Sequence, residues 1–222
     1  DGWGGVVYVC ESGGGGGSIC GFEEPRWFTG APSAAVSAGL RDVDAILGRD
    51  DRLVDKLCAA AAQIAAPFAA IIGTPVPAVI ATDYQALRRL AEKRLSLPVV
   101  TIETKGTERY DTGASMAYEG LCRRFARKEL ARQRGRLNVL GALPLDTGCT
   151  EYTFLQEFLR HTGWQDVRLF GTHGLTDSET AGAAEKNPVL APAGLAAARY
   201  LAEAFAPHFA AAHPVFPEVG QL

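Results

Sequence analysis

The sequence has no apolar run long enough to cross a membrane, because its most apolar stretch, residues 59–72, is interrupted by Gln63 and Pro67. It also has no excess of positive charge, since 22 lysines and arginines stand against 25 aspartates and glutamates. Binding to a phosphate backbone requires a surplus of cations, so we expect no nucleic acid and no membrane among its partners. The first five residues lack the basic and apolar regions of a signal peptide and run almost directly into a strand, which suggests a fragment or a processed chain.

Cysteines and histidines are few and scattered. The five cysteines, at positions 10, 20, 58, 122 and 149, include no CxxC pair. An odd number without a signal peptide favours a reducing compartment with free thiols or metal ligands, so we expect a cytoplasmic protein. The four histidines do not cluster, which disfavours a zinc site. The sequence also lacks a P-loop, a GxGxxG and a GxSxG motif, which argues against standard nucleotide binding and serine hydrolysis.

What the sequence does contain is a regular alternation of short apolar runs and helical segments. The runs lack alternating polarity, as expected for strands that are covered on both faces. Strands are predicted at residues 6–10, 68–73, 99–103, 137–141, 167–170 and 189–191, with a further apolar strand candidate between His208 and His213. Helices are predicted at residues 50–65, 82–95, 112–133, 151–162, 177–186 and 192–205. This alternation predicts an α/β fold of βαβ units with parallel sheets.

The predicted organisation is two Rossmann-like parallel-sheet lobes that follow a glycine-rich N-terminal segment. We assign residues 1–48 to that segment, 49–134 to the first lobe and 135–222 to the second. Right-handed crossovers would place the ligand-side loops along one edge of each sheet. The N-terminal segment includes five consecutive glycines, Gly13 to Gly17, which either pass close to a ligand or are flexible, and flexibility is the commoner outcome.

Two polar loops follow predicted strands of the first lobe. One carries Thr74 beside two prolines, and it is either a pocket wall or a rigid βα turn; the turn explains the prolines equally well and is favoured from the sequence alone. The other carries Thr104 and leads through Tyr110 into a helix, an arrangement that suits ligand contact at a helix N-terminus. A plain capped loop explains the second about as well.

Cys20 lies in the densest group of reactive and aromatic residues, 19–28. Such a cysteine could ligate an iron–sulfur cluster or a metal, or it could belong to a surface turn anchored by aromatic side chains. One cysteine cannot hold a cluster alone, and Cys10 is its nearest neighbour in sequence. Cys58 and Cys122 fall on apolar helical faces and are predicted to be core thiols.

Short motifs recur in one order along nearly the whole chain. They are EPRWF at 24–28, SAGL at 37–40, DAILG at 44–48, DRL at 51–53, GTPVP at 73–77, TDY at 82–84, TKG at 104–106, Tyr110, GASM at 113–116, NVLGA at 138–142, PLD at 144–146 and AGLAAA at 193–198. In this order the set resembles the nitrogenase component 1-type oxidoreductases, and in particular the short nitrogenase-like proteins of anaerobic bacteria.

The resemblance implies Rossmann-like lobes with a metallocluster near a subunit interface. It implies electrons from an ATP-dependent iron-protein reductase, and a homo- or hetero-dimer with a component 1-like subunit. In that family a loop cysteine ligates the cluster, so Cys20, and less well Cys10, are the expected ligands of an iron–sulfur cluster. Thr74, Thr104 and Tyr110 would bind the cofactor in the cleft between the lobes. The alternative is a non-catalytic scaffold that binds a cofactor, a metal or a tetrapyrrole.

The chain also departs from the family pattern. The Gly13 to Gly17 run stands where related chains carry their loop cysteine, no cysteine precedes Gly39 at the second cluster position, and Pro75 stands where cluster-binding relatives have cysteine. A third lobe would follow residues 214–220. We therefore expect either a fragment that lacks part of the N-terminus and the third lobe, or a reduced member whose cluster differs, is shared with a partner chain, or is absent.

Overall fold

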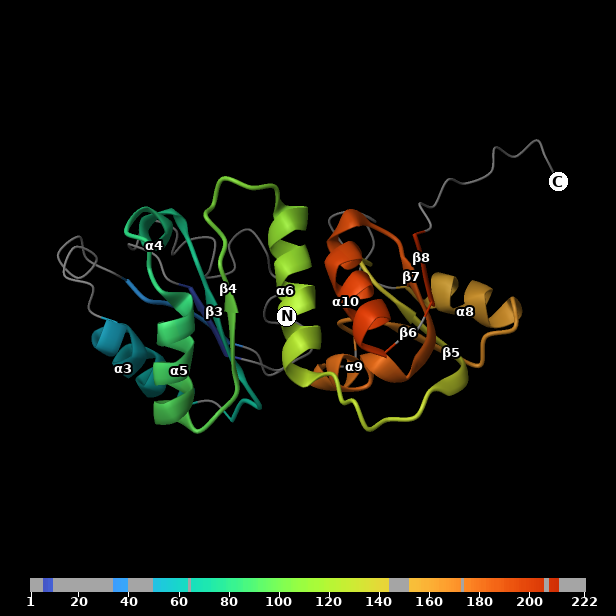
Figure 1. The fold of residues 1–222 in the computed structure, drawn as a ribbon, viewed down its shortest axis with the longest axis horizontal. Coiled ribbons are helices and arrows are strands. Elements are labelled where there is room, and N and C mark those ends of the chain that lie inside the picture. The colour runs from blue at the N-terminus through green and yellow to red at the C-terminus, as the bar shows by residue number, and fades with distance from the viewer. Residues whose placement is uncertain are drawn as a thin grey trace. The chain divides into compact units, whose positions relative to one another are not determined.

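The computed structural model describes residues 6–9, 34–39, 50–63, 65–143, 152–172, 174–205 and 208–211. The chain forms two compact units, Asp1–Gly113 and Ala114–Leu222, which we call the first and second lobes (Figure 1). Each lobe has its own sheet, and every strand pair in the two sheets is parallel. The predicted α/β class with parallel sheets is therefore confirmed. The boundary between the two lobes, after Gly113, falls within a helix, and the finer division into residues 1–48, 49–134 and 135–222 stays a prediction.

The sheet of the first lobe has the strand order β2-β1-β3-β4. Its strands are β1 (Val6–Val9), β2 (Ala34–Ser37), β3 (Ala69–Ile72) and β4 (Val99–Ile102). The first strand in sequence lies inside the sheet, with β2 on one side and β3 on the other. The direction of winding therefore reverses between β1 and β3, and in open α/β sheets ligands bind at the carboxyl ends of the strands beside such a reversal.

Helices of the first lobe form because apolar residues recur on one side of each. They are α3 (Asp50–Ala61), α4 (Pro75–Val79), α5 (Tyr84–Leu95) and the start of α6 (Tyr110–Phe125). The core between sheet and helices includes Leu57, Ile71 and Leu87, all fully buried. Asp83 caps α5, because its carboxylate accepts hydrogen bonds from the amides of Gln85 and Ala86 at 3.0 and 2.9 Å. This cap fixes the direction in which α5 leaves the carboxyl edge of the sheet.

The sheet of the second lobe has the order β6-β5-β7-β8, so its winding reverses between β5 and β7. Its strands are β5 (Gln133–Val139), β6 (Asp166–Leu169), β7 (Ala184–Val189) and β8 (His208–Ala211). Its helices are α8 (Thr153–His161), α9 (Leu175–Glu179) and α10 (Leu195–Phe205), with short 3₁₀ turns η2 (Ala181–Ala183) and η3 (Pro192–Gly194). Leu137 and Val139 of β5 pack with Leu155 and Leu159 of α8, so α8 covers one face of this sheet.

The helix predicted at residues 177–186 is wrong. Helix α9 ends at Glu179, and β7 begins at Ala184. The strand predicted at 189–191 was consequently placed too late, since only its first residue lies in β7. Residues 181–186 have high helix propensity, but the chain there joins the sheet beside β5, so tertiary pairing overrides local preference.

The structure also differs from the prediction in the length of one helix and in two short elements. The helix predicted to reach residue 133 ends at Phe125, because β5 begins at Gln133. Neither β2 nor α4 is predicted by the sequence pattern, since they span only four and five residues. Pro75 begins α4 at the first helical position, where proline needs no amide partner, so the proline that indicated a turn starts a helix.

Candidate functional site at the carboxyl edge of the first sheet

The carboxyl ends of β1 and β3 lie side by side at the winding reversal of the first sheet. Val9 and Ile72 are register partners at these two ends. In sequence, Cys10 follows Val9 and Gly73 with Thr74 follows Ile72. Cys10 and Cys20, the predicted metal ligands, lie outside the described residues. The described part of this edge therefore consists of residues 38–39 after β2 and of the loops after β3 and β4.

A hydrogen bond ties the two loops together. The Thr104 hydroxyl donates to the Gly73 carbonyl oxygen at 2.6 Å. The amides of Gly73 and Thr104 both donate to the Ile102 carbonyl, at 2.8 and 2.9 Å. The structure thus brings the loops of the predicted residues Thr74 and Thr104 together, and the Thr104 hydroxyl serves as the tie between them.

Gly73 is held between backbone and a buried side chain. A Cβ at this position would lie 2.7 Å from the Thr104 carbonyl oxygen and would also meet the hydroxyl of Tyr84, a buried residue at the start of α5. Tyr84 was not among the predicted site residues. Its place directly after the capping residue Asp83 was the signal available in the sequence.

Pro75 packs against the neighbouring loop. A Cβ at Gly106, whose φ is +73°, would lie 2.7 Å from the pyrrolidine ring of Pro75. The pyrrolidine ring of Pro75 thus lies directly against the loop after β4. Thr74 precedes Pro75 in an extended conformation, and its side chain makes no capping hydrogen bond to α4.

Tyr110 is the first residue of α6 and is 53% exposed. In the loop before it, the Glu108 carboxylate accepts a hydrogen bond from the Lys105 amide at 3.1 Å. Hydrogen bonds from the backbone amides of Glu108 and Lys105 lower the pKa of the Glu108 carboxyl, because they stabilise its ionised form. This exposed loop therefore carries a carboxyl group whose pKa is lower than the ordinary pKa of glutamate.

The two cysteines that the structure describes are core thiols, as predicted. Cys58 is partly buried against the core of the first lobe, and Cys122 is fully buried in the second. Burial raises the pKa of the Cys122 thiol, so it stays protonated and is a poor metal ligand. Among the described residues, no group of three or more histidine, cysteine, aspartate or glutamate side chains could hold a metal ion.

An iron–sulfur cluster therefore does not fit the described residues on their own. The edge provides hydroxyl and backbone groups, whereas such clusters are held by cysteine thiolates. Any thiolates at this edge would have to come from cysteines outside the described residues, among them Cys10 and Cys20, or from a partner chain.

The corresponding edge of the second sheet is occupied by backbone. Gly141 follows β5 with a φ of +79°, and a Cβ there would lie 2.7 Å from the Ala191 carbonyl oxygen and 3.0 Å from the Gly194 amide nitrogen. A Cβ at Gly194 would lie 2.8 Å from the Leu140 carbonyl carbon. The loops after β5 and β7 thus pack directly on one another.

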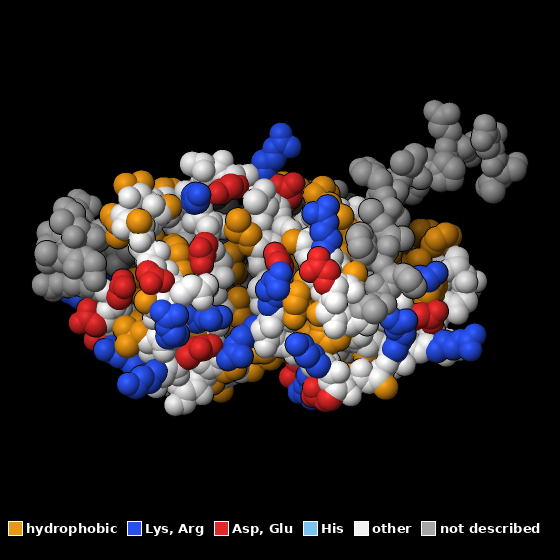
Figure 2. Space-filling view, in the orientation of Figure 1, with side chains coloured by type: hydrophobic (Ala, Val, Ile, Leu, Met, Phe, Trp, Pro, Cys, Tyr) orange, Lys and Arg blue, Asp and Glu red, His pale blue; other side chains and the backbone are white. Residues whose placement is uncertain are grey.

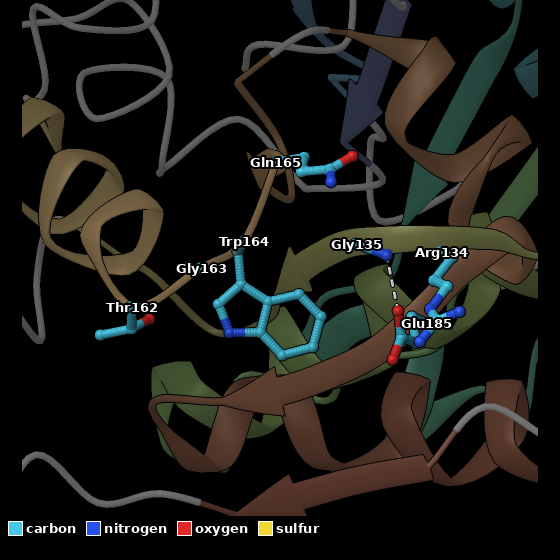
Figure 3. Close-up of a pocket in the computed structure, with 7 residues that line it drawn as sticks. All are labelled: Arg134, Gly135, Thr162, Gly163, Trp164, Gln165 and Glu185. Atoms are coloured by element: carbon cyan, nitrogen blue, oxygen red, sulfur yellow. Dashed lines mark hydrogen bonds between the residues drawn. The ribbon is translucent and has the colours of Figure 1, made fainter.

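A pocket of about 420 Å³ lies at the opposite, amino-terminal edge of the second sheet (Figure 3). Its lining includes the Trp164 indole and the Glu185 carboxylate, which accepts a hydrogen bond from the Gly135 amide at 2.6 Å (Figure 3). The Lys186 ammonium lies 5.6 Å from the centre of the Trp164 ring. None of the predicted site residues lines this pocket, and parallel sheets bind substrates at the other edge.

The described surface carries both charge signs and some exposed apolar side chains. Acidic and basic residues are interspersed on the face shown in Figure 2. Phe154 and Phe158 of α8 are 81% and 55% exposed. None of the helices within the described ranges is both long and apolar enough to span a membrane.

Two Rossmann-like lobes, each with a parallel sheet whose winding reverses at an inner strand pair, define an α/β protein of the doubly wound kind. The family model of nitrogenase component 1 type oxidoreductases matches residues 22–216. The chain belongs to this family of oxidoreductases.

Solved structures show the same fold. One titled "Nitrogenase Cp1 at pH 6.5" aligns with a TM-score of 0.75 and 14% identity over 94% of this chain and 50% of that chain. Another, titled "Nitrogenase Cp1 at pH 5", aligns with a TM-score of 0.68 and 18% identity over 90% of this chain and 41% of that chain. The chain thus spans half or less of the length of these structures. No curated protein sequence matches it.

Proposed function

We propose that the chain is a nitrogenase component 1-like subunit that holds an iron–sulfur or related metallocluster and passes electrons from an ATP-dependent iron-protein reductase to a bound substrate. The observation that carries this proposal is the family match over residues 22–216. The position of Cys10 in sequence, directly after the strand that borders the winding reversal of the first sheet, supports it. A bound cluster would supply one-electron chemistry.

Under this proposal Cys20 and Cys10 ligate the metal, and Thr74, Thr104 and Tyr110 contact the cofactor. The contacts of the loops after β3 and β4 support a positioning role for Thr104. Its hydroxyl is committed to the Gly73 carbonyl, so it would fix the loop that carries Thr74. The subunit would act with the reductase and with a component 1-like partner, either a second copy or a sister chain.

Metal analysis after anaerobic purification tests the proposal. We expect iron and acid-labile sulfide in the wild-type protein and their loss in Cys20→Ser, with a smaller loss in Cys10→Ser. Cys58→Ser is the matched control, because Cys58 belongs to the hydrophobic core of the first lobe and should leave the iron content unchanged. Wild-type protein without iron or sulfide would refute the cluster.

A second candidate is a non-catalytic scaffold for a tetrapyrrole or a metal complex. The packing of Pro75 against the Gly106 loop favours it, because a ring rather than a thiol occupies this part of the edge. Absorption titration of the iron-free protein with a tetrapyrrole such as haem separates the two functions. Saturable binding without iron or sulfide in the purified protein would support the scaffold.

A further inference from the structure

Two buried asparagines lie next to each other in the sheet of the second lobe. Leu137 of β5 pairs with Lys186 of β7, and Leu140 pairs with Val189, so Asn138 is the register partner of Asn187. Partners on adjacent parallel strands point to the same face of a sheet, about 4.8 Å apart. Their exposed fractions are 3% and 0%.

The face that carries the two asparagines is the one opposite α8. Leu137 and Val139 point towards α8, so Asn138 points away from it. Right-handed crossovers place the connections from β6 to β7 and from β7 to β8 on this second face. Consistent with this, Arg136, two residues before Asn138, donates a hydrogen bond to the Thr180 hydroxyl after α9 at 2.7 Å.

The buried side of α10 combines two small residues with one large one. Helix α10 packs on β7, and its buried residues are Ala197, Ala198 and Leu201. Two alanines in this short set leave the covering layer thin, since their side chains end at Cβ.

The amide groups of the pair are not satisfied by the described protein. The Asn138 Nδ2 group and both the Nδ2 and Oδ1 groups of Asn187 have no hydrogen-bond partner among the described residues. Each buried polar group left without a partner costs roughly 1–3 kcal/mol. Native proteins avoid this cost with ordered water or another polar ligand, at about one buried water per 27 residues.

The charges on this face indicate which ligand fits. Burial and the nearby Arg168 lower the pKa of the Arg136 guanidinium, while Asp166 and Asp177 oppose that shift. Asp166 lies 3.5 Å from Arg136 and 3.2 Å from Arg168, so both arginines already have an acidic neighbour. A cation would be repelled by the arginines, and an anion would have to displace Asp166. A neutral molecule that both donates and accepts hydrogen bonds meets neither obstacle.

We propose that Asn138 and Asn187 form an internal hydration site that holds at least one ordered water molecule between β5, β7 and α10. The water accepts hydrogen bonds from the side-chain amides and donates one to the Asn187 Oδ1 atom. It thereby links the two strands at which the winding of the second sheet reverses.

A high-resolution crystal structure of the wild-type protein tests the site directly. We expect a water oxygen about 2.7–3.2 Å from the Asn138 Nδ2 atom and from the Asn187 amide. A direct bond between the two side-chain amides, with no water in contact with either, would overturn the proposal.

Oxygen-17 relaxation dispersion, which counts long-lived waters in solution, gives a second measurement. The near-isosteric double variant Asn138→Leu/Asn187→Leu should lose at least one long-lived water relative to wild type. Gln85→Leu, at an exposed position of α5, is the control and should lose none. An unchanged count in the folded double variant would contradict the site, and the wild-type crystal structure decides if that variant does not fold.

Discussion

Replacing Gly141 by alanine tests the backbone contact that closes the carboxyl edge of the second sheet. Its φ of +79° costs an alanine roughly 1–2 kcal/mol. The new Cβ would also lie 2.7 Å from the Ala191 carbonyl oxygen, and such overpacking costs about 1–3 kcal/mol more. The free energy of unfolding of the second lobe should therefore fall by roughly 2–5 kcal/mol, a large part of the stability of a domain this size.

The matched control is Gly163→Ala. Gly163 also has a positive φ, +103°, but a Cβ there meets no atom within 4 Å, so only the backbone strain remains. We expect the melting temperature of Gly141→Ala to lie about 5–20 °C below that of Gly163→Ala. Circular dichroism and tryptophan fluorescence during urea and thermal unfolding measure both variants. If Gly141→Ala is no less stable than Gly163→Ala, the contact between the β5 and β7 loops is not as described.

Three further predictions concern single groups. Thr104→Val removes the hydroxyl that binds the Gly73 carbonyl and should lower the free energy of unfolding by about 0.5–1.5 kcal/mol in urea, whereas Thr107→Val at an exposed position should not. Glu108→Gln should lower the melting temperature above pH 4.5, the ordinary pKa of this carboxyl, because a carboxyl with a lowered pKa stabilises the folded state only while it is ionised. The difference in melting temperature from wild type should vanish as the pH falls through the lowered pKa of Glu108. A difference that grew in acid would have the wrong sign. Cys122 should react with a thiol reagent only after unfolding, so Cys122→Ala should leave the number of thiols titrated in the native protein unchanged and reduce the number titrated in denaturant by one.

The strands that could be predicted from the sequence are those with apolar residues of their own in the short segment that forms the strand. For β3, β4 and β6, the predicted bounds differ from the observed ones by at most one residue at each end. The residues of β3 and β4 are short apolar runs that are almost completely buried, as in a strand covered on both faces, whereas β6 alternates buried Val167 and Leu169 with half-buried Asp166 and Arg168. The meeting of the Thr74 and Thr104 loops follows from the same pattern, because neighbouring parallel strands end at a common edge.

Features that depend on distant parts of the chain were not predictable in this way. Strand β7 contains Glu185, Lys186 and Pro188, and it is a strand because it pairs with β5, about fifty residues earlier. The contact of Tyr84 with Gly73 depends on how α5 packs on the sheet, which no local pattern specifies. The same holds for Asn138 and Asn187, since their adjacency follows from the strand order.

The two sheets share a strand order, and each is built from a contiguous part of the chain. All partners in the first sheet have been synthesised once Ile102 is added, whereas the second sheet waits for β8, which ends at Ala211. At about 5–20 residues per second, the ribosome needs on the order of 10 s for the intervening segment. This interval is longer than most of the microsecond-to-second folding times of small domains. The first lobe can therefore complete its hydrogen-bonded sheet during translation, before the last strand of the second sheet has been synthesised.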